Sequence, residues 1–300
     1  MKIVTAGKSY MDIDAYAGII AYAELLELLG QNGKAVSSAV LNESITTTVL
    51  GWGNKIVDTY EPSDDDEFII IDVSDPNYLD KYVDIQRVIE VIDHHPAHDK
   101  YWQAKSNVRT QIEKVGAACT QVYELWIEAG KLSEMSELSA RLLITGILDN
   151  TLNFGAQITN LRDHKAYKAM LPIANLPEDW PAKYFSECQI AIEEDLNKAI
   201  YNDTKTGMVK LPLIMGQMVI WDAKAIVVRR FDEIVAAMST EGGPWLMNAV
   251  SISDNKSIFI ATDEHVKQQI GELLNVRFEG NIAQASRMWL RKEIQAEALK

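Results

Sequence analysis

The sequence predicts an α/β protein with a doubly wound, mainly parallel sheet and a second, smaller α/β domain. Short apolar runs alternate with amphipathic stretches over the first 150 residues. The runs FIIID and VIEVID are apolar on both faces, which is typical of parallel strands covered by helices. The pattern then changes after a proline-rich stretch at 171–181, where proline stops helices and stiffens a connection. We therefore expect a first domain over residues 1–175 and a second over residues 176–300.

Hydrophobic periodicity and glycine or proline positions define the individual elements. In the first domain we expect strands and one long helix before a helical region that covers 115–170. In the second domain we expect a helix followed by three strands and another helix. The predicted elements are strands at Lys2–Ala6, Lys34–Leu41, Phe68–Ile71, Val88–Ile92, Lys210–Asp222, Trp245–Ser251 and Ser257–Ala261, and helices at Ala15–Leu29, Ala182–Ile200 and Val266–Val276.

Charge and cysteine content exclude several classes of protein. The 300-residue chain has 43 acidic and 29 basic side chains and a formal charge of −14, which disfavours binding to long nucleic acid because that binding relies on cationic side chains. A small phosphorylated substrate stays possible if a metal supplies positive charge. Cys119 and Cys188 are too few for a disulfide framework or a cysteine zinc site. Without a signal sequence or a long apolar run, we expect a cytoplasmic protein that does not contact membranes.

Four acidic or histidine-bearing segments fall where the predicted strands or helices end. They are MDIDA, IIIDVSD, VIDHH and GILDNT. A single aspartate after a strand is often a helix cap, and a lone histidine is more often structural than a ligand. Together, however, carboxylates and imidazoles suit Mn²⁺ or Mg²⁺, and ligands gather beyond the carboxyl ends of such strands. The acidic or histidine positions are Asp12, Asp14, Asp72, Asp93, His94, His95 and Asp149.

These segments, in this order, resemble the DHH phosphoesterase superfamily over roughly residues 1–155. The resemblance implies metal ligation by Asp12, Asp14, Asp72, His94 and Asp149, with one or two ions of Mn²⁺ per chain and with Mg²⁺ or Co²⁺ as alternatives. It also implies that His95 faces the phosphate, and that Asp93 orients an imidazole. Asp75 is a weaker candidate because it could equally cap the next helix. The stretch VGAACTQVYE resembles a family helix start that would place Gly116 and Thr120 beside phosphate, although Thr120 could equally be an interior helix hydroxyl.

Two positions depart from the family pattern. Lys8 stands where the family has a metal-binding histidine, and the segment GKSYMDID has Met11 in place of a proline. A protonated lysine cannot ligate a metal, so we expect Lys8 to neutralise Asp12 or contact phosphate and leave one high-affinity ion. The alternative is that Lys8 points to solvent and two ions bind. The segment ILDNTLNF also has one residue more than the family between Asp149 and Phe154, which changes the position of Thr151.

The second domain resembles the manganese-dependent inorganic pyrophosphatase and exopolyphosphatase branch. The segments DTK, GQMV and SRM follow in that branch's order, whereas the GGGH motif of exonucleases and dinucleotide hydrolases is missing. The resemblance therefore assigns Lys205 and Arg287 to the substrate phosphate, with Arg291, Lys292, Arg229 and Arg230 as substitutes. Both Lys205 and Arg287 could instead be solvated surface cations. Met288 stands where the branch has a lysine, which weakens the match to pyrophosphate.

We expect a metal-dependent hydrolase of phosphoanhydride bonds in pyrophosphate or short polyphosphate. One alternative is a phosphodiesterase for short oligonucleotides or nucleotides such as pAp, for which Trp221, Trp245 or Trp289 could supply a base platform. A second alternative is a family member that has lost activity and binds phosphate or nucleotide, which Lys8 favours. A homodimer through the first domain is compatible with the resemblance.

Overall fold

A computed structural model describes residues 1–300 apart from residues 54, 96, 208–209 and 212. The chain divides into two compact units, Met1–Tyr184 and Phe185–Lys300, and the division falls inside helix α7 (Trp180–Glu194). Among the helices of the described residues, none has the length and apolar character needed to cross a membrane.

The first unit contains a five-stranded sheet in the order β2-β1-β3-β4-β5, and all of its neighbouring strands are parallel. The prediction of a parallel sheet is therefore confirmed. Strand order reverses between β1 and β3, which is where ligands bind in doubly wound sheets. The strands are β1 (Lys2–Thr5), β2 (Gly33–Ala35), β3 (Glu67–Ile71), β4 (Val88–Asp93) and β5 (Arg109–Ile112).

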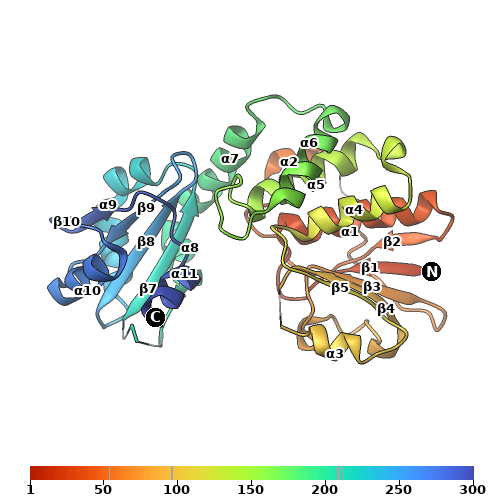
Figure 1. Ribbon diagram of the computed structural model, residues 1–300, viewed down its shortest axis with the longest axis horizontal. Coiled ribbons are helices and arrows are strands. Elements are labelled where there is room, and N and C mark those ends of the chain that lie inside the picture. Colours follow the sequence, from red (N-terminus) through yellow and green to blue (C-terminus); the bar gives the residue numbers. More distant parts are fainter. Residues whose placement is uncertain (54, 96, 208–209, 212) are drawn as a thin grey trace. The chain divides into compact units, whose positions relative to one another are not determined.

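Helices cover both faces of this sheet (Figure 1). On one face lie α1, α4 and α5, while the short α3 lies on the other. Of the sixteen residues of α1, thirteen are buried, because this helix lies between the sheet and α4 and α5. The helices of the first unit are α1 (Ile13–Leu28), α2 (Thr47–Gly51), α3 (Asp99–Gln103), α4 (Ala118–Glu128), α5 (Glu137–Asn150) and α6 (Leu161–Ala174), with short 3₁₀ turns at Pro76–Tyr78, Ile85–Arg87 and Leu132–Glu134.

Three local predictions were wrong. The strand expected at Lys34–Leu41 is only Gly33–Ala35. The proline-rich stretch does not begin with a helix end, because Pro172 lies inside α6, in its last turn. The helix expected at Ala182–Ile200 is two helices, since Asp195 begins α8 by accepting a hydrogen bond from the Lys198 amide at 3.1 Å.

The second unit contains a six-stranded mixed sheet in the order β10-β11-β9-β8-β7-β6, in which only β7 and β8 are parallel among the described strands. The predicted strand at 210–222 is shorter than expected, and residue 212 within it lies outside the described residues. The elements are β6 (Thr204–Lys205), β7 (Ile214–Ile220), β8 (Trp245–Ser251), β9 (Lys256–Ile260), β10 (Phe278–Glu279), β11 (Ile282–Gln284), α8 (Leu196–Asn202), α9 (Ala223–Ser239), α10 (Glu264–Leu274) and α11 (Arg291–Ala298).

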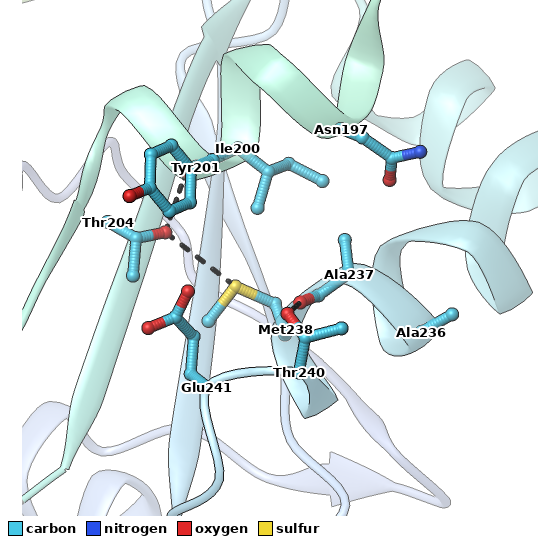
Figure 2. Close-up of a pocket in the computed structure, with 9 residues that line it drawn as sticks. All are labelled: Asn197, Ile200, Tyr201, Thr204, Ala236, Ala237, Met238, Thr240 and Glu241. Atoms are coloured by element: carbon cyan, nitrogen blue, oxygen red, sulfur yellow. Dashed lines mark hydrogen bonds between the residues drawn. The ribbon is translucent and has the colours of Figure 1, made fainter.

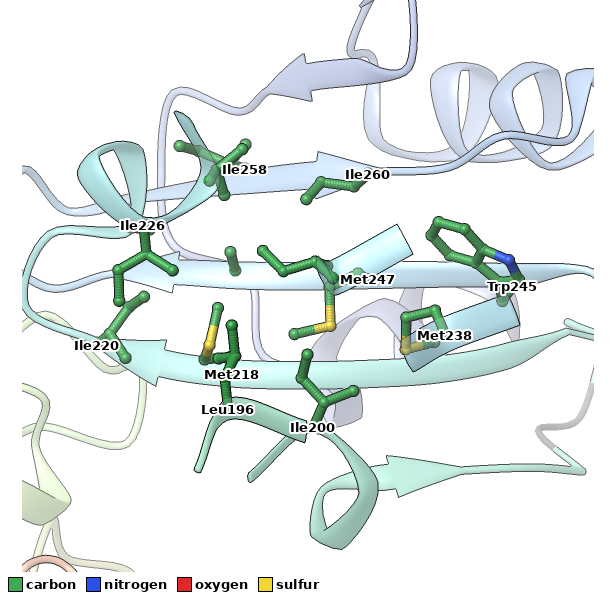
Figure 3. Close-up of a cluster of buried hydrophobic side chains, with 14 residues drawn as sticks. Leu196, Ile200, Met218, Ile220, Ile226, Met238, Trp245, Met247, Ile258 and Ile260 are labelled. Atoms are coloured by element: carbon green, nitrogen blue, oxygen red, sulfur yellow. The ribbon is translucent and has the colours of Figure 1, made fainter. Parts of the chain in front are cut away.

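Apolar side chains line both faces of the second sheet. On one face, Met218 and Met247 meet Leu196 of α8 and Ile226 of α9 (Figure 3). On the other, Phe259 and its neighbours meet α10 and α11. The second unit therefore has its own hydrophobic core.

Candidate metal centre

The acidic and histidine side chains of the first unit gather at the carboxyl ends of β1, β3 and β4. Asp12 is the N-cap of α1 after β1 and accepts a hydrogen bond from the Ala15 amide at 3.0 Å. Asp72 directly follows β3, and Asp93 is the last residue of β4. Because parallel strands end at one edge of the sheet, residues far apart in sequence meet at the reversal point between β1 and β3.

His94 and Asp72 present two buried polar atoms toward each other. His94 Nδ1 lies 3.1 Å from the Val115 carbonyl oxygen, and because a carbonyl only accepts, Nδ1 carries the hydrogen. In the neutral ring the Nε2 lone pair therefore faces Asp72 Oδ1 at 3.3 Å and Asp14 Oδ2 at 3.7 Å. Neither His94 Nε2 nor Asp72 Oδ1 has a hydrogen-bond partner among the described residues. An imidazole lone pair and a carboxylate oxygen buried without partners are the donors that a divalent cation requires.

Asp14 is a fully buried carboxylate that caps helix α4. Its Oδ2 accepts from the Ala118 amide and its Oδ1 accepts from the Cys119 amide, both at 2.8 Å, and the Asn150 side-chain amide also donates to Oδ2. Gly146 in α5 permits this close approach, because a Cβ there would lie 2.5 Å from Cys119 Sγ. Asp14 is therefore fixed by helices on both sides before any ligand binds.

His95 is oriented by Asp93. The His95 backbone amide and Nδ1 both bond to Asp93 Oδ1, at 3.0 and 2.9 Å. The side chain of His95 is 63% exposed, in contrast to that of His94. The Asp93 hydrogen bond raises the pKa of His95 above its ordinary value, although burial acts in the opposite direction. His95 can therefore carry a proton while facing solvent.

Burial and mutual repulsion raise the pKa values of the clustered acids. Burial, followed by the charges of Asp14 and Asp12, raises the pKa of Asp72 well above its ordinary value. Burial and the Asp14 charge also raise the pKa of Asp12, and burial raises the pKa of Asp149 to about 7. Carboxylates so crowded repel one another unless a cation lies between them.

Comparison with known proteins agrees with this geometry. The DHH family, N-terminal domain, matches residues 2–147, a range that holds β1–β5 and all the strand-end acids described above. The first unit contains a DHH family domain.

Two proteins similar to this chain are named as pyrophosphatases. A “Probable manganese-dependent inorganic pyrophosphatase” of Bacillus licheniformis is 26% identical over 59% of this chain and 57% of its own length. A protein of the same name from Bacillus cereus strain B4264 is 24% identical over 97% of this chain and 96% of its own. With the DHH match, these relatives identify the chain as a hydrolase.

A solved structure shows that the fold extends over both units. The “putative family II inorganic pyrophosphatase” of Methanococcus jannaschii aligns over 100% of each chain, with a TM-score of 0.65 and 18% identity. At this identity the likeness shows the fold alone.

Asp149, Asp75 and Lys8, other positions predicted in the first unit, have different surroundings. Asp149 Oδ1 accepts a hydrogen bond from the Tyr184 hydroxyl at 2.8 Å, and that hydroxyl is also 3.0 Å from the Ser44 carbonyl oxygen. Asp75 caps the turn at Pro76–Tyr78, accepting from the Asn77 amide at 2.9 Å. Lys8 is exposed, and its ammonium donates to the Asn77 carbonyl oxygen at 2.7 Å rather than to Asp12.

The backbone amide of Gly116 and the hydroxyl of Thr120 both donate to the carboxylate of Asp163. The Gly116 amide lies 3.1 Å from both oxygens of Asp163, and the Thr120 hydroxyl donates to Asp163 Oδ1 at 2.6 Å. The sequence reasoning missed Asp163, as it missed Asn150 and Tyr184. Asn150 directly follows Asp149, a predicted ligand, so its place in the sequence could have suggested a role. Nothing in the sequence around Asp163 or Tyr184 indicates their long-range contacts.

In the second unit, hydrogen bonds connect two of the three predicted motifs, the segments around Asp203 and Gln217. The Gln217 amide donates to the Asp203 carbonyl oxygen at 3.0 Å, and the Arg291 guanidinium forms an ion pair with Asp203. Lys205 is exposed beside Asp203 in β6. Arg287 forms an ion pair with Glu293 at 2.9 Å and stacks on the ring of Trp289. Arg287, and Arg291 as its proposed substitute, are therefore both held by contacts within the second unit.

The second unit also has a hollow of about 380 Å³ between α8 and α9 (Figure 2). Nine described residues line it, and none is basic: Asn197, Ile200, Tyr201, Thr204, Ala236, Ala237, Met238, Thr240 and Glu241. With Glu241 as its charged group, this hollow does not suit phosphate.

Proposed function

We propose that the chain hydrolyses phosphoanhydride bonds in pyrophosphate or short polyphosphate, with a divalent cation held at the DHH cluster. The observation that carries this proposal is the buried pair formed by His94 Nε2 and Asp72 Oδ1, 3.3 Å apart and without hydrogen-bond partners among the described residues. The naming of the relatives as inorganic pyrophosphatases supports the substrate class.

The donor set suits Mn²⁺. Asp12, Asp14, Asp72 and Asp149 offer hard carboxylate oxygens, and His94 adds one imidazole nitrogen, a combination that favours Mn²⁺ or Mg²⁺ over thiolate-loving metals. The relatives are named manganese-dependent. When bound, such an ion supplies Lewis acidity, which polarises a phosphoryl oxygen and acidifies a water.

His95 is the group that we assign to the substrate phosphate. Because Asp93 accepts from His95 Nδ1, the opposite nitrogen is free to face solvent. The raised pKa of His95 favours a protonated ring, whose Nε2–H can donate to a phosphate oxygen or give its proton to the departing phosphate. Asp93 holds the ring in that orientation.

We further propose, from the order of the DTK, GQMV and SRM segments, that Lys205 and Arg287 contact the substrate phosphate. Fixed cations stabilise the charge that spreads over a transferring phosphoryl group. Lys8 is a third candidate, since an ammonium can act on phosphate as a point charge.

A substrate panel tests the proposal. Metal-free protein would be loaded with Mn²⁺ and given pyrophosphate, tripolyphosphate, pAp and a dinucleotide, with released phosphate or nucleotide measured. We expect hydrolysis of pyrophosphate or tripolyphosphate at least tenfold faster than that of pAp. Faster cleavage of pAp or the dinucleotide would instead establish a phosphodiesterase, and binding without any hydrolysis would establish a phosphate-binding protein.

A further inference from the structure

A buried carboxylate behind the cluster, that of Asp163, has no role in the chemistry proposed above. Asp163 lies at the third position of α6 with none of its surface exposed. It accepts from the Gly116 amide at 3.1 Å, from the Thr120 hydroxyl at 2.6 Å and from the Asn160 amide at 2.8 Å. In the described part of the chain no ion pair to Asp163 is found. A buried anion is costly unless strong hydrogen bonds compensate for its lost hydration.

The segment that is hydrogen-bonded to Asp163 also contacts two predicted metal ligands, His94 and Asp14. Gly116 follows Val115, whose carbonyl accepts the His94 Nδ1 hydrogen at 3.1 Å. Two residues after Gly116, the Ala118 amide donates to Asp14 at 2.8 Å, and the next amide does the same. The five residues from Val115 to Cys119 therefore contact Asp163 on one side and His94 and Asp14 on the other.

The fit around Gly116 is close. A Cβ at this position would lie 2.6 Å from Asp163 Oδ2, so only glycine lets the backbone reach the carboxylate. Thr120, in the first turn of α4, bonds the same carboxylate from the helix. Because Asp163 is bonded by both the loop and the first turn of α4, it fixes the angle at which α4 begins.

We infer that Asp163 is a positioning residue for the metal centre, holding Val115–Cys119 so that His94 Nε2 and Asp14 Oδ2 stay within reach of one cation. The inference rests on the proposed metal site, not on the identity of the substrate. A carboxylate is needed because both of its oxygens accept; an asparagine would turn an NH₂ group toward an N–H or O–H donor and leave buried donors unpaired.

The test is Asp163→Asn, measured by calorimetric Mn²⁺ titration of the metal-free full-length protein. We expect Mn²⁺ affinity to fall about 10–100-fold, as it does when a residue that orients a metal ligand is changed. A second readout is the ¹⁵N resonance of the His94 ring in the metal-free protein, which should shift as the Val115 bond weakens.

The matched control is Asn160→Ala. Asn160 caps the same helix through the Arg162 amide at 2.8 Å, and its side-chain amide donates to the Lys114 carbonyl oxygen at 3.4 Å. Its side chain does not bond Gly116, so the variant loosens α6 and the Lys114 contact while the contact of Asp163 with Gly116 is kept. The inference is overturned if Asp163→Asn binds Mn²⁺ within twofold of Asn160→Ala and leaves the His94 resonance unchanged.

A second variant keeps the test decisive if Asp163→Asn does not fold. Thr120→Val preserves side-chain shape and removes one donor to Asp163; it should weaken Mn²⁺ binding more than Asn160→Ala, and equal affinities would overturn the inference. The substrate panel is read separately on the unmutated protein: absence of hydrolysis there contradicts the proposed function, whereas the Mn²⁺ affinities alone decide the role of Asp163.

Discussion

Asp72 adopts a backbone conformation that few side chains tolerate. Its φ is +62°, in the left-handed region that disfavours residues other than glycine, asparagine and aspartate. The Asp72 amide donates to the Ile92 carbonyl oxygen at 2.8 Å, which locks the turn between β3 and β4. Strained residues of this kind persist when the surrounding structure enforces them and are common at functional sites. The turn directs the Asp72 carboxylate toward His94.

We predict that Asp72→Asn abolishes Mn²⁺ binding and hydrolysis while the fold is kept. The amide has nearly the same shape as the carboxylate but lacks the charge that a cation requires. Calorimetric Mn²⁺ titration measures the effect, and circular dichroism checks folding. Asp75→Asn, three residues later on the same loop, is the matched control and should bind Mn²⁺ normally. Equal Mn²⁺ affinity in the two variants would remove Asp72 from the proposed site.

We expect Lys8 to limit the number of ions that the proposed centre can hold. Its ammonium bonds to the Asn77 carbonyl oxygen and is exposed, so in this structure it does not neutralise Asp12. It still offers no lone pair to a metal when protonated. We predict one tightly bound Mn²⁺ per chain in the unmutated protein and two in Lys8→His, because the family resemblance places a metal-binding histidine at this position. Elemental analysis after gel filtration counts the ions, and a count of two without the mutation contradicts the prediction.

At the scale of elements, the metal centre depends on how closely α5 approaches the start of α4. Gly146 makes that approach possible, since a Cβ there would lie 2.5 Å from Cys119 Sγ and 3.4 Å from Asp14 Oδ1. Burial, followed by the neighbouring Asp14 charge, raises the pKa of the Cys119 thiol well above its ordinary value. Cys119 is therefore an inert packing residue and not a nucleophile.

We predict that Gly146→Ala lowers the free energy of unfolding by about 1–3 kcal/mol, which is the usual cost of overpacking a dense core. We also expect weaker Mn²⁺ binding, because the added methyl group would displace Asp14. Gly51→Ala is the control, since a Cβ at the end of α2 enters open space. Chemical denaturation of both variants measures the difference. Equal stabilities would show that α5 can move away without cost.

At the scale of the whole molecule, the acid cluster makes stability depend on pH and metal. Burial raises the pKa of Asp149 from an ordinary value of 3.8 to about 7, and burial raises that of Asp72 in the same direction. An acid whose pKa is higher in the folded state binds more protons there than in the unfolded state. Its contribution to stability is therefore full below about pH 4 and is lost as pH rises toward 7.

We predict that metal-free protein loses stability as pH rises from about 4 to about 7, and that Mn²⁺ restores it most strongly at the upper end of this range. Each unit of pKa difference corresponds to about 1.4 kcal/mol, and metal affinity rises as the ligands lose protons. Thermal unfolding with and without Mn²⁺ measures both effects. Asp149→Asn should flatten the pH dependence of the metal-free protein, and an unchanged slope would show that Asp149 does not titrate in this range.

Much of the fold of the first unit could be predicted because its causes are local. The runs FIIID and VIEVID are apolar on both faces, which is typical of central parallel strands. Since each strand end carries an acid or a histidine, one sheet edge must collect them. Element ends were less predictable: Asp195 divides one expected helix, and α6 continues through Pro172, because caps and the surrounding contacts compete with propensity.

The sequence by itself determined the parallel sheet and the gathering of Asp12, Asp72 and His94 at its edge, since strands that are apolar on both faces and the acids or histidines at their ends are visible along the chain. Only the tertiary structure decided which partners fix those groups. Asp14 is held by amides more than 100 positions away, and Asp163 bonds the Gly116 amide across 47. The physical reason is that a buried carboxylate requires donors, and which donors reach it depends on how the helices meet rather than on any local pattern.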